Sequence, residues 1–307
     1  MIKHDPQGAL NAIEYLLDAN GSLEEYQRRS VGVHMQLLSI MALLFMFMFN
    51  AYRSIQMTFK RSHKVSSWCC LVSTMTGVAY VGGAALNHHM PYGPSCRTVV
   101  WAAIIGMTIA TMAMNTLLLE RAYLAHQRNR FLLVFGIFLI LPAPTLIYRA
   151  WIEVEAKFSP ASGCYAKYPA SFPSFRLLID LPPNVVFTCA FVMVIYQQYR
   201  RYGDRCWKRL ARNGIVTMML VVVSNLTCML CNVFNAFGEV SDVLFIVDWA
   251  ITSTLVVENT YRMTSSRLHT STLDEKSKTP HQRNQHRRLP SNDFRTQAVY
   301  DTQYTLR

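Results

Sequence analysis

Charged residues are scarce in this chain. They make up 16% of its 307 residues, whereas aromatic, aliphatic and cysteine residues make up 51%. A soluble globular domain carries about 25% charged residues, so this composition argues against one. The apolar residues come in blocks of about 18 to 22, long enough for a helix to cross a hydrocarbon core about 30 Å thick. The composition therefore predicts a multi-pass helical membrane protein, with the lipid bilayer as its first partner.

The chain also lacks the patterns that several other classes require. No apolar block alternates with period two, which argues against a membrane barrel, and no internal repeat suggests a duplicated transporter. P-loop, HExxH and nucleophile-elbow motifs are absent, and His88-His89 has no further metal ligands inside an apolar block. No block interior carries the lysine that a microbial retinal protein needs for its Schiff base. We therefore expect neither an enzyme nor a bound metal or cofactor.

The apolar blocks predict seven membrane spans. They cover about 33–54, 68–86, 98–119, 131–149, 177–198, 215–236 and 243–263. The predicted fold class is all-α, a seven-transmembrane helix bundle over residues 33–263. Residues 1–32 form an extracellular segment without a cleavable signal peptide, and residues 264–307 form a polar, basic cytoplasmic tail whose composition predicts disorder.

Lysine and arginine are distributed unevenly among the segments between spans. They concentrate in 199–213 and in the C-terminal tail. The positive-inside rule then places the N-terminus outside and the C-terminus in the cytoplasm. This topology and anionic inner-leaflet lipid account for the net charge of +12, so no nucleic-acid partner is expected. On the outer face, Asn20 lies in a glycosylation sequon, Asn20-Gly21-Ser22.

Only two of the eight cysteines, Cys96 and Cys164, fall in predicted outer loops. Two lone cysteines in an oxidising compartment favour a disulfide over two free thiols. This bridge would hold the long loop before span five over the outer end of span three. Cysteines inside the spans, such as Cys228 and Cys231, are expected to pack as small apolar residues.

Together these features resemble the rhodopsin-like G-protein-coupled receptors. The resemblance rests on seven spans with the N-terminus outside, on Cys96 and Cys164 in their loops, and on Glu120-Arg121 at the inner end of span three. The spacing from Cys96 to Arg121 also matches that between the family's bridge cysteine and its Asp/Glu-Arg-Tyr arginine. The resemblance implies a plasma-membrane receptor that transmits the binding of an external ligand to a heterotrimeric G protein at the cytoplasmic loops.

Several positions depart from the family's pattern. The box reads Glu120-Arg121-Ala122-Tyr123, which displaces the tyrosine by one, and span two lacks the family's aspartate. Span six has no Cys-Trp-x-Pro element and no acidic partner for Arg121, and span seven has no Asn-Pro-x-x-Tyr. Ala103 stands where amine receptors carry an aspartate. The stretches YRRYGDRCWKRLARNG and DWAITSTLVVE also resemble a group of fungal seven-helix membrane proteins.

Glu120, Arg121 and Tyr123 have two interpretations. Arginine at the inner end of a membrane helix ordinarily reaches lipid phosphate and suits the negative end of the helix dipole. Glu120 offers no such benefit near hydrocarbon, and a glutamate that holds Arg121 until a partner competes for it would form a two-state element. The sequence favours neither the charged collar nor the signalling switch.

Polar residues inside the spans predict an outward-open ligand pocket between spans three, five, six and seven. Its candidates are Trp101, Asp180, Asn232, Asn235 and Asp248. Pro182-Pro183, close behind Asp180, are expected to break or kink span five. For the asparagines we favour the alternative of interhelical hydrogen bonding, and for Asp248 a functional role. Intramembrane acids also leave open a second function, a small-molecule or ion transporter or channel.

Overall fold

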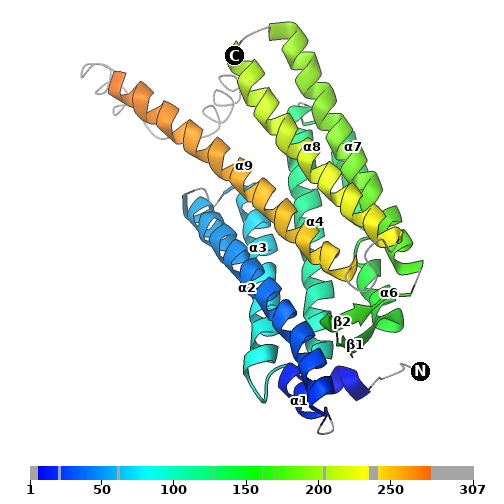
Figure 1. The fold of residues 1–307 in the computed structure, drawn as a ribbon. Coiled ribbons are helices and arrows are strands. Elements are labelled where there is room, and N and C mark those ends of the chain that lie inside the picture. The colour runs from blue at the N-terminus through cyan, green and yellow to red at the C-terminus, as the bar shows by residue number, and fades with distance from the viewer. Residues whose placement is uncertain are drawn as a thin grey trace. The chain divides into compact units, whose positions relative to one another are not determined.

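The computed structural model describes residues 6–19, 22–60, 63–126, 128–160, 162–169, 171–202, 205–234 and 241–277, and it omits the side chains of 6–7, 125, 191, 194–218, 241–242 and 263–277. The described part is mostly helical (Figure 1). Contacts divide the chain into two units, Met1–Tyr261 and Arg262–Arg307. The packing described below is that of the first unit.

The elements follow one another in a simple order. A 3-10 helix η1 (Pro6–Ala9) precedes helices α1 (Ala12–Leu17), α2 (Leu23–Lys60), α3 (Val65–His89), α4 (Cys96–Ala125), α5 (Arg130–Ile140) and α6 (Thr145–Glu153). Strands β1 (Glu155–Ser159) and β2 (Gly163–Lys167) come next, followed by helices α7 (Ser171–Tyr202), α8 (Arg205–Val233) and α9 (Ser241–Ser277).

Five helical segments are long and apolar enough to cross a membrane, within the residues that the structure describes. They are Leu23–Lys60, Val65–His89, Cys96–Leu124, Arg130–Glu153 and Val243–Arg262. Met219–Val233 in α8 is a shorter apolar helix. The protein is therefore an integral membrane protein by the length and composition of its helices.

The predicted apolar blocks fall in helices, the sixth as far as Val233, but two details differ from expectation. The block at 131–149 is interrupted between α5 and α6, because Pro142 and Pro144 lie there and a proline lacks the N–H that a helix interior uses. At Pro182-Pro183, where a break or a kink was expected, α7 continues through both prolines, so the helix does not end there. Helix α9 extends past the predicted span to Ser277, so the first residues of the expected tail are helical; residues 278–307 lie outside the described part.

The all-α prediction missed an antiparallel hairpin. Strands β1 and β2 pair with Phe158 opposite Cys164 and Ser159 opposite Gly163. Gly163 has φ +72°, in the left-handed region that a side chain disfavours, and an added Cβ would also meet the amide of Gln36. The short run EAKFS and the glycine after it gave no strand signal that stands out from a loop of similar length.

Helix α4 is the most enclosed of the candidate spans. Of its apolar window 61% is buried, against 17% for Arg130–Glu153. It packs against α3, α5, α6 and α7 and against both strands. Small residues on α4, such as Ala103, Gly106 and Ala110, allow this close approach; Gly106 lies against the Trp249 ring and the Thr76 carbonyl.

Candidate functional site: the cap, the ion network and the Arg121 contact

The hairpin is attached to the bundle at two points. Cys96, the first residue of α4, forms a disulfide with Cys164 of β2, so the predicted pair is bonded. Gln36 of α2 binds both backbone groups of Cys164: its Nε2 donates to the carbonyl at 2.8 Å and its Oε1 accepts from the N–H at 2.8 Å. The hairpin is thereby held between α2 and α4.

The N-terminal segment packs onto the same hairpin. The rings of Tyr15 and Phe158 stack with centroids 4.4 Å apart, and the Arg29 guanidinium lies 4.6 Å from the Tyr15 ring. Burial raises the pKa of the Tyr15 phenol above its ordinary value. The Cys96 N–H donates to the Leu10 carbonyl at 3.0 Å. We call residues 6–19 together with the hairpin 155–167 the cap.

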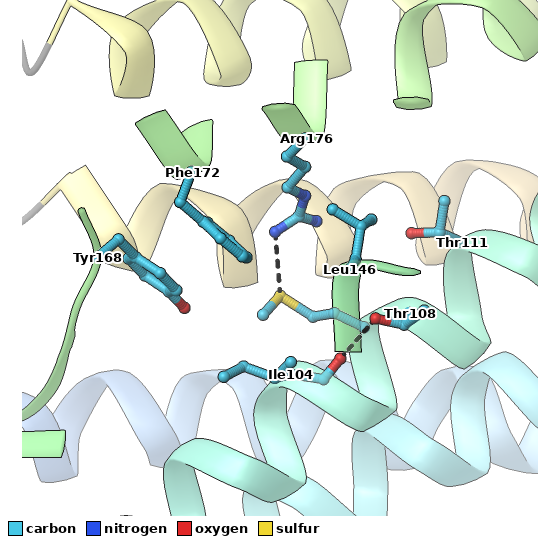
Figure 2. A pocket seen from close by; sticks show the side chains of 8 residues that line it. Ile104, Thr108, Thr111, Leu146, Tyr168, Phe172 and Arg176 are labelled. Atoms are coloured by element: carbon cyan, nitrogen blue, oxygen red, sulfur yellow. Dashed lines mark hydrogen bonds between the residues drawn. The ribbon is translucent and has the colours of Figure 1, made fainter. Parts of the chain in front are cut away.

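The cap changes the expectation of an open pocket. Its parts contact α2, α3 and α4 at the ends where the hairpin is attached. A small cavity lies nearby, and Figure 2 shows the side chains that enclose it. They are Ile104, Met107, Thr108, Thr111, Leu146, Tyr168, Phe172 and Arg176. The space suits single water molecules and is far below the size of a drug-sized ligand.

None of the predicted pocket residues that the structure describes lines this cavity. Trp101 instead packs against Trp151, with ring centroids 4.8 Å apart, beside the apolar cluster of the cap. Asn232 is 5% exposed, and among the described residues neither of its amide atoms has a hydrogen-bond partner. Asn235 and the sequon residue Asn20 lie outside the described residues.

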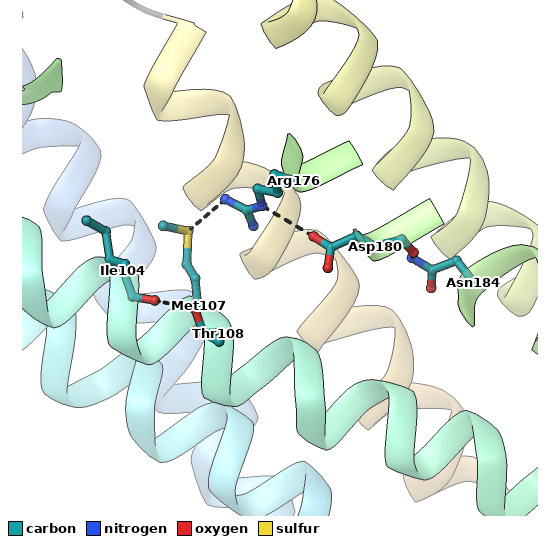
Figure 3. A network of polar contacts seen from close by, with 6 residues as sticks. All are labelled: Ile104, Met107, Thr108, Arg176, Asp180 and Asn184. Carbon is teal, nitrogen blue, oxygen red and sulfur yellow. Dashed lines mark hydrogen bonds and ion pairs between the residues drawn. The ribbon is translucent and has the colours of Figure 1, made fainter. Parts of the chain in front are cut away.

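Asp180 belongs to a buried ion network, shown in Figure 3. Its Oδ2 lies 3.3 Å from Nε of Arg176, one helical turn earlier on α7. Arg176 also reaches across to α4, where Nη1 lies 4.0 Å from Sδ of Met107, and its guanidinium lies 4.1 Å from the Phe245 ring of α9. The Asp180 carbonyl accepts from Asn184 Nδ2 at 2.8 Å. The network connects α7 to α4 and α9.

Asp248 lies close to this network. The Ser224 hydroxyl of α8 donates to its Oδ1 at 3.1 Å, and the carboxylate is within electrostatic range of Arg176 and Asp180. Of the predicted pocket residues, Asp180 and Asp248 are thus within electrostatic range of each other. We refer to Arg176, Asp180 and Asp248 as the acid cluster.

At the other end of α4, Arg121 points to α9. Its Nη2 donates to Oγ1 of Thr260 at 2.7 Å, and the Cys70 thiol of α3 lies 3.9 Å from the same oxygen. The Thr260 hydroxyl donates in turn to the Val256 carbonyl at 2.8 Å. A single side chain of α9 thus joins α3 and α4.

The two interpretations of Glu120 and Arg121 both remain open, since the two charges interact electrostatically but no ion pair between them is found among the described residues. Consecutive helix residues point about 100° apart. The Glu120 carboxylate is within electrostatic range of Arg121 and Lys64 and near the Ser66 backbone N–H at the start of α3. Within the part of the chain that the structure describes, its Oε2 has no hydrogen-bond partner. Tyr123 is half-buried on the same helix. Glu120 therefore faces the positive end of the α3 dipole, where a carboxylate is stabilised.

Sequence reasoning missed the partners of the predicted residues. These partners are ordinary polar residues, and nothing in the sequence around them indicates a role in a contact between helices. They are Gln36, Arg176, Ser224 and Thr260. The i, i+4 spacing of Arg176 and Asp180 was the one available signal.

Neither a metal site nor a relative identifies the protein. No group of three or more His, Cys, Asp or Glu side chains converges among the described residues. The chain matches no family model, and a search of curated proteins finds no match.

Proposed function

We propose that the chain is a seven-span membrane receptor, with its N-terminus outside and its C-terminus in the cytoplasm, that passes an external signal to a heterotrimeric G protein. The spans would be α2, α3, α4, α5–α6, α7, α8 and α9. Basic residues concentrated in 199–213 and beyond Arg262 support this orientation, because they belong on the cytoplasmic side. A receptor for an external ligand fits the plasma membrane.

The observation that carries the proposal is the pair of attachments at the two ends of α4. Its first residue, Cys96, is covalently bound to the cap through Cys164. Near its last turn, Arg121 binds Thr260 of α9. A displacement of the cap would therefore be transmitted along α4 to the Arg121–Thr260 contact near the other end of this helix.

The Arg121 contact has the strength that a switch needs. A hydrogen bond from a charged group to a neutral hydroxyl contributes about 1.5–3 kcal/mol, less than a buried ion pair costs to break. A ligand that favours the broken state by a similar free energy shifts the population of the two states. Once released from Thr260, the guanidinium is free to bind a cytoplasmic partner. The contact itself does not include Glu120, whose carboxylate lies near the start of α3.

The test is nucleotide exchange by a panel of heterotrimeric G proteins on the purified full-length receptor in nanodiscs. Arg121→Ala is expected to change basal exchange by about threefold to tenfold relative to the wild type, since about 1 kcal/mol of coupling corresponds to about a fivefold shift. Arg130→Ala is the matched control, because Arg130 is an exposed arginine at the start of α5. Equal exchange in the wild type and Arg121→Ala, with every G protein of the panel, would contradict the proposal.

A transporter is the second candidate, and the acid cluster is the observation that favours it. Acidic groups held among membrane helices serve ion and proton pathways in many transporters. In this case proteoliposomes should show proton or cation flux that falls at least tenfold in Asp248→Asn, while Glu153→Gln leaves it unchanged. Absence of flux in wild-type vesicles would exclude this candidate.

A further inference from the structure

Helix α9 is also attached to α2, close to the turn that carries Thr260. Arg53 of α2 and Glu258 of α9 form an ion pair, two residues before Thr260. Both side chains are partly exposed, 26% for Arg53 and 29% for Glu258. Because water reaches both charges, this pair can separate without leaving a buried charge unpaired, whereas a fully buried pair cannot. The pair therefore holds α9 by a contact that a modest change in free energy breaks.

The Arg53 guanidinium contacts α9 at a second residue. It lies 5.2 Å from the ring centroid of Tyr261, and 4.2 Å from that of Phe49, one turn earlier on α2. Both distances are within the range of a cation–π interaction. Glu258 and Tyr261 are three positions apart, so they share a face of α9. One side chain of α2 thus contacts α9 both before and after Thr260.

The preceding turns of α9 are held by buried contacts. Trp249 is 7% exposed, and its ring centroid lies 5.1 Å from that of Phe47 and 6.0 Å from that of Tyr80. Asn50 of α2, which is 2% exposed, donates from Nδ2 to Oγ1 of Thr254 at 2.8 Å. Loss of these contacts would open a cavity and leave a buried amide unpaired, which costs more than separating a partly exposed ion pair. We therefore expect α9 to stay in place as far as Thr254.

The Arg121–Thr260 contact is sensitive to a small rotation of the α9 segment that follows. Thr254 and Thr260 are six positions apart, which is about 9 Å along a helix. A rotation of about 10° at Thr254, directed away from α4, displaces the Thr260 hydroxyl by about 1.6 Å. The 2.7 Å hydrogen bond from Nη2 of Arg121 would then exceed the range of a hydrogen bond and be lost.

We propose that Arg53 is a positioning residue of the switch: by pairing with Glu258, it holds the Thr260 turn of α9 against Arg121. Release of the pair lets this turn move away from α4, and the Arg121 contact is lost with it. The inference rests on the proposed receptor function, because it names what regulates the Arg121–Thr260 contact. The position of the Thr260 turn, however, can be measured without a signalling assay.

Cys70 of α3 reports the position of the Thr260 turn. Its side chain is buried, and its thiol lies 3.9 Å from Oγ1 of Thr260. When the turn moves away, the thiol is uncovered and reacts faster with N-ethylmaleimide, a neutral reagent that enters membranes. Mass spectrometry of the purified full-length protein in nanodiscs measures the labelling rate at Cys70 separately from that at Cys69.

Charge reversal on either side of the pair should release the Thr260 turn. Arg53→Glu and Glu258→Arg are each expected to raise the Cys70 labelling rate by at least about threefold, and to change basal nucleotide exchange in the same direction as Arg121→Ala. The double variant, in which the two charges are exchanged, should return both rates to within about twofold of the wild type. Because this exchange keeps the total charge, such recovery requires a direct interaction between the two side chains.

Arg149→Glu is the matched control. Arg149 also forms a partly exposed ion pair, with Glu153, and a cation–π contact, with Phe175. Its reversal should leave Cys70 labelling at the wild-type rate. Unchanged labelling in both single variants, or an exchanged pair that labels as fast as the single variants, would overturn the proposal. Labelling that follows the expected pattern without nucleotide exchange in the wild type would support the positioning of α9 by Arg53 and overturn the receptor function alone.

The wild type decides the outcome if the variants fail to fold. Salt screens a partly exposed ion pair, so raising KCl from about 0.05 M to about 1 M should speed Cys70 labelling about twofold. The reaction of the same reagent with glutathione corrects for any effect of salt on the chemistry itself. A corrected Cys70 rate that is independent of salt would refute the role of Arg53.

Discussion

Replacing Cys96 and Cys164 together with serine should lower the thermal unfolding midpoint of the purified protein by about 5–15 °C, which corresponds to about 2–5 kcal/mol. The bridge joins residues 68 apart in sequence, so its loss restores much freedom to the unfolded chain. It also leaves the hairpin attached to the bundle through Gln36, since the two backbone hydrogen bonds of Cys164 do not need the sulfur. The midpoint is measured by differential scanning fluorimetry.

Cys189→Ser is the control for this pair, because Cys189 is a free, exposed cysteine. It should leave the midpoint within about 1 °C of the wild type, as surface substitutions usually do. A reducing agent should lower the wild-type midpoint and have no effect on the double variant. If the double variant and the wild type unfold at the same temperature without reductant, the cap does not depend on the bridge.

The second large effect is expected at Arg176. Arg176→Ala leaves the 2% exposed Asp180 without its cation, and removal of one partner of a buried pair costs about 3–5 kcal/mol. It also removes the contacts with Phe245 and Met107, which connect α7 to α9 and α4. We expect a lower yield of monodisperse protein and a midpoint at least about 8 °C below that of the wild type.

Two comparisons isolate the charge from the lost packing. Adding Asp180→Asn to Arg176→Ala should recover part of the midpoint, because the unpaired acid is gone. Lower pH should recover part of it too, since the folded variant binds a proton on the unpaired acid that the unfolded chain binds less tightly, and stability then rises as pH falls. Arg149→Ala, in the half-exposed pair with Glu153, should cost about 1 kcal/mol or less. An Arg176→Ala midpoint equal to that of Arg149→Ala would refute the prediction.

Hydropathy predicted the apolar helices because a membrane span needs about 20 consecutive, mostly apolar residues, which is a local pattern in the sequence. The disulfide was also predictable, because Cys96 and Cys164 were the two cysteines outside the apolar blocks and the cytoplasmic loop. The helices follow from local composition alone, and the disulfide follows from the cysteine positions and the oxidising compartment expected for the outer loops. The hairpin between them is different: five-residue strands carry little pattern, and its stability comes from Gln36, distant in sequence.

Side-chain partners could not be read from the sequence for a related reason. Asp180 and Asp248 were singled out as intramembrane acids, and in the structure they lie within electrostatic range of each other. The sequence did not show that Arg176 takes only one of them. For Glu120 and Arg121, adjacency in sequence suggested a pair, whereas the helical rotation between them directs one to α3 and the other to Thr260.

The central claim is that the Arg121–Thr260 contact restrains signalling, and a double-mutant cycle on G-protein nucleotide exchange tests it most directly. Thr260→Val keeps the shape of the side chain and removes the hydroxyl that accepts from Arg121. The account predicts that Arg121→Ala and Thr260→Val each change basal exchange in the same direction by a similar factor, and that the double variant changes it no further. Effects that multiply in the double variant, or exchange unchanged from the wild type in all three variants, would contradict it.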